Sequence, residues 1–286
     1  MNAEKTDYEL LYNPRLVVPD HPQIFDRWES SSERARASLE GYLDVPYGPA
    51  EAEKLDLFRA QGRSRGLLMY IHGGYWRSLD KKRFSFVAPA LAKAGITVAI
   101  PNYALCPAVQ VENIVLQVVQ ACVWLYRNGA NFGVPAHRLF VCGHSAGGHL
   151  AAMMLCCQWP QYAPDLPTKV VSSALSISGL YDLTEIVKVP SINNDVRLTV
   201  KSAVKVSPAF MPPATDAPFY TAVGGRENEG FHIQNALIAK RWGKARRADV
   251  PCPGENHFTI LDELCRPESS LFGAVLQMMD SGKDPV

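Results

Sequence analysis

The amino-acid sequence predicts an α/β protein with one doubly wound, mostly parallel sheet of about eight strands and helices on both faces. The first observation is a series of short, continuous apolar runs, which suit strands buried on both faces of a parallel sheet. The second is that segments of helical period lie between these runs. The third is a pair of extended segments that precede the alternation and look like an antiparallel pair.

The elements before the alternation form an N-terminal arm and an edge. Residues 1–40 are predicted to be an arm, in which the polar, proline-free stretch from Ile24 to Leu39 is helical. The segments YLDVPYG and EKLDLFRA follow as the strand pair. Pro46 interrupts the first of them, and because proline cannot donate to a strand ladder, we expect that strand at an edge.

The alternating part supplies the centre of the sheet. Ile114, Val118, Ala121 and Leu125 share one face of a predicted helix between two of its strands. The apolar runs predicted as strands are Leu67–Ile71, Ile96–Ile100, Leu139–Cys142, Ala174–Ile177 and Phe219–Val223.

This pattern predicts a single domain over residues 1–286, without a second unit. The stretch 184–213 lies between two predicted strands and is long enough for a small insertion. Ligands on such sheets bind at the carboxyl ends of the strands, so we expect the insertion to cover the site.

Composition excludes several classes of function. The formal net charge is +1 and no basic stripe is present, which disfavours a nucleic-acid or anionic-membrane partner. No apolar run approaches the length of a membrane span, and the first residues do not resemble a signal peptide. The seven cysteines are dispersed without metal-ligand spacing, so we expect reduced core residues, a cytoplasmic location and no metal. A small-molecule substrate is the expected partner, and a homodimer is one option for the oligomeric state.

A G-x-S-x-G motif carries the chemistry. GHSAG, centred on Ser145, lies between a predicted strand and a predicted helix, where a strained turn would expose a nucleophilic serine. The alternative is an incidental Gly/Ser helix start, which this placement disfavours. A serine attacking a carbonyl needs donors for the oxyanion, and we expect backbone N–H groups from Ala146 and from Gly73 and Gly74 in the turn HGG.

The serine also needs a base and an orienting acid, which follow it along the chain on this fold. His257, after the last strand, is the predicted base; His144 and His149 lie too near the serine in sequence. The loop RENEGF offers Glu227 and Glu229, and the position nearer the strand end favours Glu227 as the acid. Asp182 is the fallback.

The motifs IHGGYW, GHSAGGHLAAM, SGLYDL and ENHFTILDEL, in this order, resemble those of the arylformamidases, or kynurenine formamidases. These belong to the esterase and lipase superfamily with an α/β-hydrolase fold, and the resemblance covers most of the chain. The loop GGRENEGF departs from the family because it lacks a proline and holds two glutamates. The roles that the resemblance implies are nucleophile for Ser145, acid for Glu227, base for His257 and oxyanion donors for Gly73, Gly74 and Ala146.

The resemblance implies a serine hydrolase without cofactor or metal that cleaves a small aryl formamide of the N-formylkynurenine type through an acyl-enzyme on Ser145. Tyr75 and Trp76 follow the oxyanion turn and are predicted to line the pocket against the aryl group, with core packing as the alternative for Trp76. A carboxylesterase of short acyl chains is the alternative activity. A non-catalytic ligand-binding module on the same fold is the alternative from another class.

Overall fold

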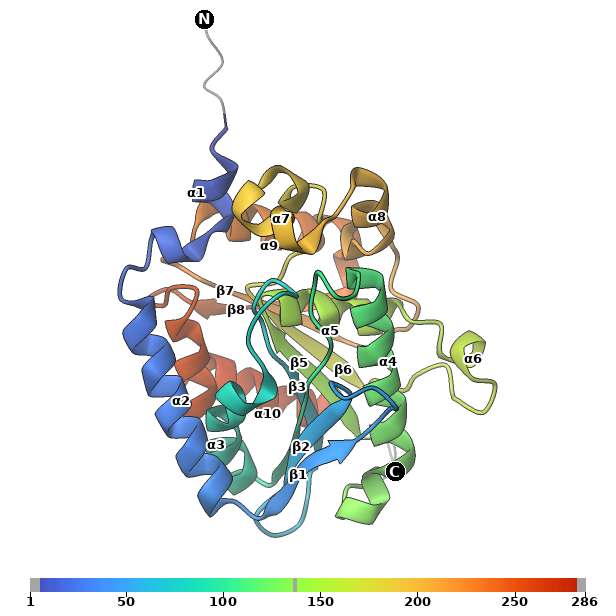
Figure 1. The fold of residues 1–286 in the computed structure, drawn as a ribbon. Coiled ribbons are helices and arrows are strands. Elements are labelled where there is room, and N and C mark those ends of the chain that lie inside the picture. Colours follow the sequence, from blue (N-terminus) through green and yellow to red (C-terminus); the bar gives the residue numbers. More distant parts are fainter. Residues whose placement is uncertain (1–5, 136–137, 282–286) are drawn as a thin grey trace, which may run out of the picture.

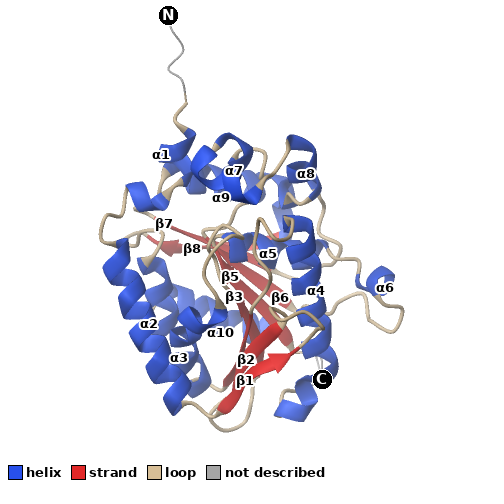
Figure 2. Ribbon diagram, in the orientation of Figure 1, coloured by secondary structure: helices blue, strands red, loops and turns tan. Residues whose placement is uncertain are grey.

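The computed structural model describes residues 6–135 and 138–281, in which an eight-stranded sheet carries helices on both faces (Figures 1 and 2). The sheet order is β1-β2-β4-β3-β5-β6-β7-β8. Only the pairs β1–β2 and β2–β4 are antiparallel within this described sheet. The strands are β1 (Gly41–Pro46), β2 (Lys54–Phe58), β3 (Gly66–Ile71), β4 (Ile96–Pro101), β5 (Leu139–His144), β6 (Ser173–Ile177), β7 (Phe219–Gly224) and β8 (Arg246–Cys252).

The doubly wound, mostly parallel sheet predicted from the sequence is therefore confirmed. The leading antiparallel pair is also confirmed, and β1, with Pro46, lies at an edge of the sheet. All five apolar runs form strands, β3 to β7. The strand β8 differs, because every second residue is exposed, only Val250 and Cys252 are buried, and it contains two arginines, so no continuous apolar run marks it.

The central strands contribute side chains to two hydrophobic cores, one on each face of the sheet. Because successive side chains on a strand point to opposite faces, Met69 of β3 belongs to one core and Tyr70 to the other. The first core packs against α4, α5 and α9, and the second against α2, α3 and α10. The helices are α1 (Tyr8–Tyr12), α2 (His21–Ser38), α3 (Ala88–Lys93), α4 (Val111–Asn128), α5 (Ala146–Cys156), α6 (Trp159–Tyr162), α7 (Pro190–Val196), α8 (Val200–Lys205), α9 (Glu229–Trp242) and α10 (Ser270–Ser281).

Two segments pack near the site from outside the central alternation. The predicted helix of the N-terminal arm is α2, which begins at His21 rather than Ile24. The arm also contains α1, which lies beside α7 and α9 (Figure 1). The stretch 184–213 forms α7 and α8 with short 3₁₀ turns. The N-terminal arm contacts the stretch 184–213 through a hydrogen bond of 2.7 Å, which Glu9 accepts from the N–H of Ser191.

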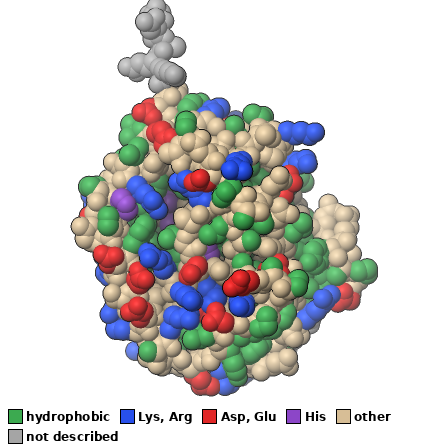
Figure 3. Space-filling model, viewed as in Figure 1, with side chains coloured by type: hydrophobic (Ala, Val, Ile, Leu, Met, Phe, Trp, Pro, Cys, Tyr) green, Lys and Arg blue, Asp and Glu red, His purple; other side chains and the backbone are tan. Residues whose placement is uncertain are grey.

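The surface shows no dominant sign of charge on the face viewed in Figure 3, where acidic and basic side chains are interspersed. Among the described helices, none is long and apolar enough to cross a membrane.

Candidate active site

Ser145 occupies a strained turn between β5 and α5. Its φ of 57° and ψ of −119° are rare for a residue with a side chain. The turn is held because the N–H of Ser145 donates to the Ile177 carbonyl at 2.8 Å. Gly143 and Gly147 leave no room for a Cβ, which would collide with the carbonyl oxygens of Gly147 and Ile71. The sharp strand-to-helix turn that the G-x-S-x-G motif predicts is therefore present.

The turn after β3 lies against Ser145. A Cβ on Gly73 would come within 3.2 Å of the Ser145 Cβ. Gly74 has a φ of 109°, and a Cβ there would collide with the backbone of Ser78. No hydrogen bond among the described residues uses the N–H of Gly73 or Gly74, and the N–H of Ala146, the first residue of α5, has no partner within the helix. Three backbone donors therefore remain available around Ser145.

His257 and Glu227 form a buried pair. The Nδ1 of His257 lies 2.6 Å from Oε2 of Glu227. The other oxygen of this carboxylate accepts hydrogen bonds of 2.6 Å from the Ser178 hydroxyl and the Gly224 N–H. Because a carboxylate only accepts, the proton of neutral His257 lies on Nδ1 and leaves Nε2 free to accept another. Ser145 and His257 line the same cavity. The hydroxyl of Ser145 makes no hydrogen bond with any described side chain, as is common before substrate binds.

The other acids considered from the sequence do not contact His257. Glu229 is exposed at the start of α9. Asp182 caps a turn instead, where its carboxylate accepts from the N–H and the hydroxyl of Thr184 at 2.9 and 2.6 Å. The acid loop therefore presents Glu227, and not its neighbour, to the histidine.

The two histidines near Ser145 in sequence have positioning contacts. His144 lines the cavity and donates from Nε2 to the carbonyl of His257 at 2.7 Å. Burial, together with the nearby His257, holds the pKa of His144 well below its usual range. His149 donates from Nε2 to the Val206 carbonyl at 2.6 Å and accepts on Nδ1 from the indole N–H of Trp76 at 3.2 Å. Burial lowers the pKa of His149 to about 4, so this ring is neutral at pH 7.

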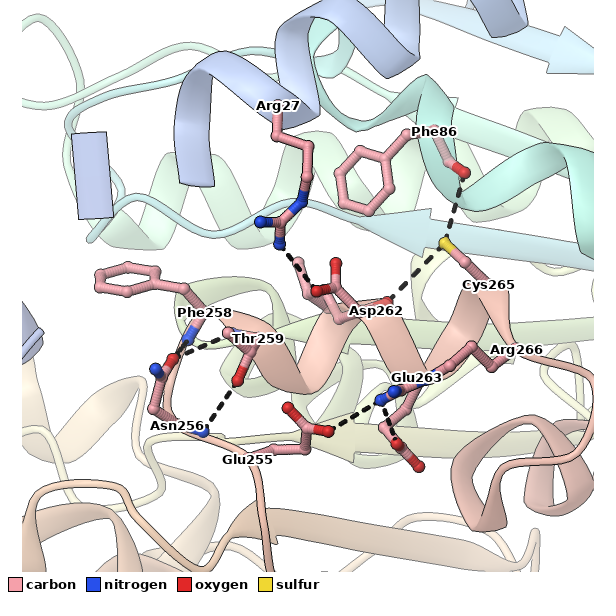
Figure 4. A network of polar contacts seen from close by, with 11 residues as sticks. Arg27, Phe86, Glu255, Asn256, Phe258, Thr259, Asp262, Glu263, Cys265 and Arg266 are labelled. Carbon is pink, nitrogen blue, oxygen red and sulfur yellow. Dashed lines mark hydrogen bonds and ion pairs between the residues drawn. The ribbon is translucent and has the colours of Figure 1, made fainter. Parts of the chain in front are cut away.

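The loop that carries His257 is braced on both sides (Figure 4). The side chain of Asn256 accepts from the N–H groups of Phe258 and Thr259 at 2.9 and 3.0 Å. Arg27 of α2 forms an ion pair of 2.7 Å with Asp262, just beyond the histidine (Figure 4). The N-terminal arm is thereby tied to the segment that holds the predicted base.

The cavity next to Ser145 has a volume of about 100 Å³. Much of its wall is aromatic, formed by Phe25, Trp28, Tyr75, Phe84 and Phe258. Ile192 of α7 also lines it, so the stretch 184–213 reaches the site. Such a wall offers flat apolar surfaces to an aryl group.

The structure corrects one predicted substrate contact. Tyr75 lines the cavity, whereas Trp76 is fully buried and does not. The indole of Trp76 packs in the core, and its N–H donates to His149. The centroids of these two rings lie 5.1 Å apart. Consecutive residues with φ of 50° and 56° place the two side chains in different surroundings, which the sequence pattern alone does not reveal.

Sequence reasoning missed the contribution of the N-terminal arm. Asn13, Arg15, Phe25 and Trp28 all line the cavity, although they lie more than a hundred residues before Ser145. No local motif marks them. The aromatic residues of the predicted helix in this arm were the one available signal.

Across the described residues, His, Cys, Asp and Glu side chains form no group of three or more that could hold a metal ion.

Comparison with known proteins gives relatives over most of the chain. A family model described as the α/β hydrolase fold matches residues 68–237. Kynurenine formamidase of Danio rerio is 37% identical over 97% of this chain and 97% of its own length. Kynurenine formamidase of Salmo salar is 32% identical over 88% of this chain and 86% of its own length.

Solved structures agree on the fold. A candidate thioesterase from Silicibacter sp. TM1040 superposes with a TM-score of 0.84 at 30% identity, over 95% of this chain and 100% of that one. Esterase B from Lactobacillus rhamnosis superposes with a TM-score of 0.68 at 16% identity, over 91% of this chain and 96% of that one, which shows a shared fold alone.

Proposed function

We propose a function for this chain from a premise that its relatives establish: it belongs to the kynurenine formamidase family of α/β-hydrolase-fold enzymes. The proposed function is cleavage of a small aryl formamide through an acyl-enzyme on Ser145. The observation that carries this proposal is one cavity that brings together Ser145, His257 with its Glu227 partner, and a wall of aromatic side chains. The first three supply the means of acyl transfer, and the aromatic wall supports an aryl substrate over an aliphatic one.

The first half of the reaction forms the acyl-enzyme. The Ser145 hydroxyl attacks the formyl carbon, and Nε2 of His257 takes its proton. Glu227 holds the histidine in the tautomer that makes this transfer possible and stabilises the imidazolium. The N–H groups of Gly73, Gly74 and Ala146 stabilise the negative oxygen of the tetrahedral intermediate. His257 then gives its proton to the departing aniline nitrogen, which leaves a formyl ester on Ser145.

The second half repeats this chemistry with water. His257 takes a proton from water, which attacks the formyl ester, and then returns it to the Ser145 oxygen as formate leaves. The proposed reaction therefore consumes one water and yields an aromatic amine and formate. Backbone donors stabilise the charge that develops, so no metal or cofactor takes part in these steps, and EDTA is expected to leave the rate unchanged.

Location and assembly are further parts of the proposal. The seven cysteines are free, which suits the reducing cytoplasm. Subcellular fractionation tests this location, and light scattering distinguishes a monomer from a homodimer.

The proposed substrate is tested by comparing kcat/KM for N-formylkynurenine with kcat/KM for short p-nitrophenyl esters. We expect the larger value for the formamide, although the esters are intrinsically more reactive. A larger value for the esters would favour a short-chain carboxylesterase, which the same triad can support. Absence of turnover with either class would favour a binding module.

A further inference from the structure

The cavity wall contains two arginines and no acidic residue. Arg15 comes from the 3₁₀ turn Pro14–Leu16 of the N-terminal arm, and Arg77 follows the oxyanion turn. Arg77 forms an ion pair with Asp195 of α7 through Nη1 alone, which leaves its other N–H groups without a bond to the described residues. The guanidinium of Arg15 has no ion pair in the described part of the chain and packs 5.8 Å from the centre of the Phe25 ring. The wall therefore holds an excess of positive charge.

The two guanidinium groups influence one another. Arg15 lines the cavity and is also exposed to solvent. Partial desolvation of its guanidinium and, next, the charge of Arg77 lower the pKa of Arg15. The two like charges at one wall repel each other, and an anion bound between them would offset this repulsion. Guanidinium groups also match the geometry of a carboxylate, which can accept two hydrogen bonds from each.

The backbone that carries Arg15 is fixed over the site. The hydroxyl of Tyr75 donates to the carbonyl of Tyr12. The Asn228 amide, next to the predicted acid, donates to the Leu10 carbonyl at 2.7 Å. The N–H of Arg15 itself donates to Asn13 Oδ1 at 3.2 Å. The arm thus presents Arg15 from a pre-organised turn, which lowers the entropy cost of using it to bind a ligand.

We propose that Arg15 and Arg77 are specificity-determining residues that bind the carboxylate of the substrate, at the end away from the formyl group. This inference rests on the proposed function, because it assigns residues of the same cavity to recognition of that substrate. The aromatic wall binds the ring, and the arginines bind the carboxylate. The neutral ester substrates used above lack this contact.

The test compares N-formylkynurenine with its carboxamide, in which a neutral group of nearly the same shape replaces the carboxylate. Wild type is expected to prefer the carboxylate in kcat/KM. A hydrogen bond to a charged group contributes about 1.5–3 kcal/mol, so Arg15→Gln and Arg77→Gln should each reduce this preference about 10- to 160-fold. The reduction should appear mainly in KM for the carboxylate. Arg15→Lys keeps the charge and should retain part of the preference, and high salt should weaken it.

Two matched variants separate recognition from structure. Asp195→Asn removes the ion pair but keeps Arg77, so the preference should persist or rise. Arg241→Gln removes an arginine that lies over Phe210, outside the cavity, and should leave the preference unchanged. Equal losses on both substrates, or an Asp195→Asn variant that loses the preference as Arg77→Gln does, would overturn the subsite.

Measurements of inhibition and binding keep this test independent of the proposed function. If wild type hydrolyses neither formamide, the proposed function fails, and inhibition of p-nitrophenyl acetate hydrolysis then decides the subsite. We expect 4-phenylbutanoate to inhibit more strongly than 4-phenylbutanamide, and Arg15→Gln to remove that difference. If p-nitrophenyl acetate is not hydrolysed either, calorimetric titration of the same two compounds gives the comparison. Equal inhibition or equal binding by the two compounds would contradict the carboxylate subsite.

Discussion

The two sides of the cavity are built in different ways. The strand-end wall, made of Gly73, Gly74, Ser145 and His257, follows directly from the carboxyl ends of β3, β5 and β8. Its backbone is strained, and a buried hydrogen bond to Glu227 fixes the His257 side chain. The N-terminal wall, made of Arg15, Phe25 and Trp28, comes from a different part of the chain and presents side chains from a turn and a helix.

This difference separates reaction from recognition. Acyl transfer needs atoms held within tenths of an ångström, which a sheet edge and strained turns can provide. Selection of a substrate needs apolar area and charge, which packed side chains can provide from any segment. Changes in the strand-end wall should therefore lower kcat, and changes in the N-terminal wall should raise KM.

After replacement of Ser145 itself, the largest expected effect is at Glu227, the proposed acid that holds His257. Glu227→Gln keeps the shape but removes the charge and can place an amide N–H against the histidine, so kcat should fall by about four orders of magnitude. Glu229→Gln, at an exposed position, should leave kcat within a few-fold of wild type. Steady-state kinetics near pH 8 measures both. Equal losses would mean that the two glutamates share the role, and no loss at either would contradict this assignment.

A smaller effect is expected at the turn of Gly73 and Gly74, which is proposed to bind the oxyanion. Gly74→Ala forces a side chain onto a φ of 109° and toward the Ser78 backbone, which tilts an N–H away from the oxyanion. Loss of one such donor lowers kcat about 10²- to 10³-fold. KM should change less than kcat. Gly254→Ala is the control, since a Cβ there meets open space. A Gly74→Ala enzyme with wild-type kcat would show that this turn is an ordinary loop that does not bind the oxyanion.

The next prediction concerns a histidine of α5 with a positioning contact rather than a catalytic one. The pKa of His149 is about 4 in the folded protein, against an ordinary value of 6.5. Between these values the unfolded chain binds the proton and the folded one does not, so the free energy of unfolding falls as pH falls from 6.5 to 4. A difference of this size corresponds to about 3 kcal/mol.

Urea unfolding at several pH values, compared between wild type and His149→Gln, measures this contribution. The variant should show a shallower loss of stability with acid, by up to about 1.4 kcal/mol per pH unit. Identical slopes for the two proteins would show that His149 is not held neutral in the folded state.

The smallest effect is expected in the N-terminal wall. Phe25→Leu removes an aromatic face from the cavity while keeping an apolar side chain, and aromatic pairing contributes about 0.5–1.5 kcal/mol. KM for the aryl formamide should rise about 2- to 12-fold, and kcat should stay close to wild type. Phe210→Leu changes an exposed aromatic outside the cavity and is the control. A loss in kcat rather than KM would break the division between the two walls.

The sequence predicted the strand-end wall better than the N-terminal wall for a physical reason. A strained turn requires particular residues at particular spacings, so glycines and a serine between a strand and a helix are visible in one short stretch. The same holds for β3 to β7, whose burial on both faces produces continuous apolar runs. The edge strand β8 follows no such rule, because one of its sides is solvated and carries Arg247, while Arg246 on the other side is accommodated by its bonds to Thr221 and Asp249.

The N-terminal wall depends on tertiary contacts that no local pattern encodes. Phe25 and Trp28 are ordinary apolar residues of an amphipathic helix, and only its packing against the Phe258 loop makes them part of the cavity. Ser178, which holds the Glu227 carboxylate, was missed for a similar reason, since its partner lies 49 residues away. Trp76 shows the reverse case, in which a residue inside a predictive motif packs in the core.

The central claim is that Ser145 carries the acyl group, and the turnover number of Ser145→Ala tests it most directly. The variant should fold, as judged by circular dichroism, and bind substrate, while kcat falls by about six orders of magnitude. A purified Ser145→Ala enzyme that keeps a tenth of wild-type kcat would contradict the claim.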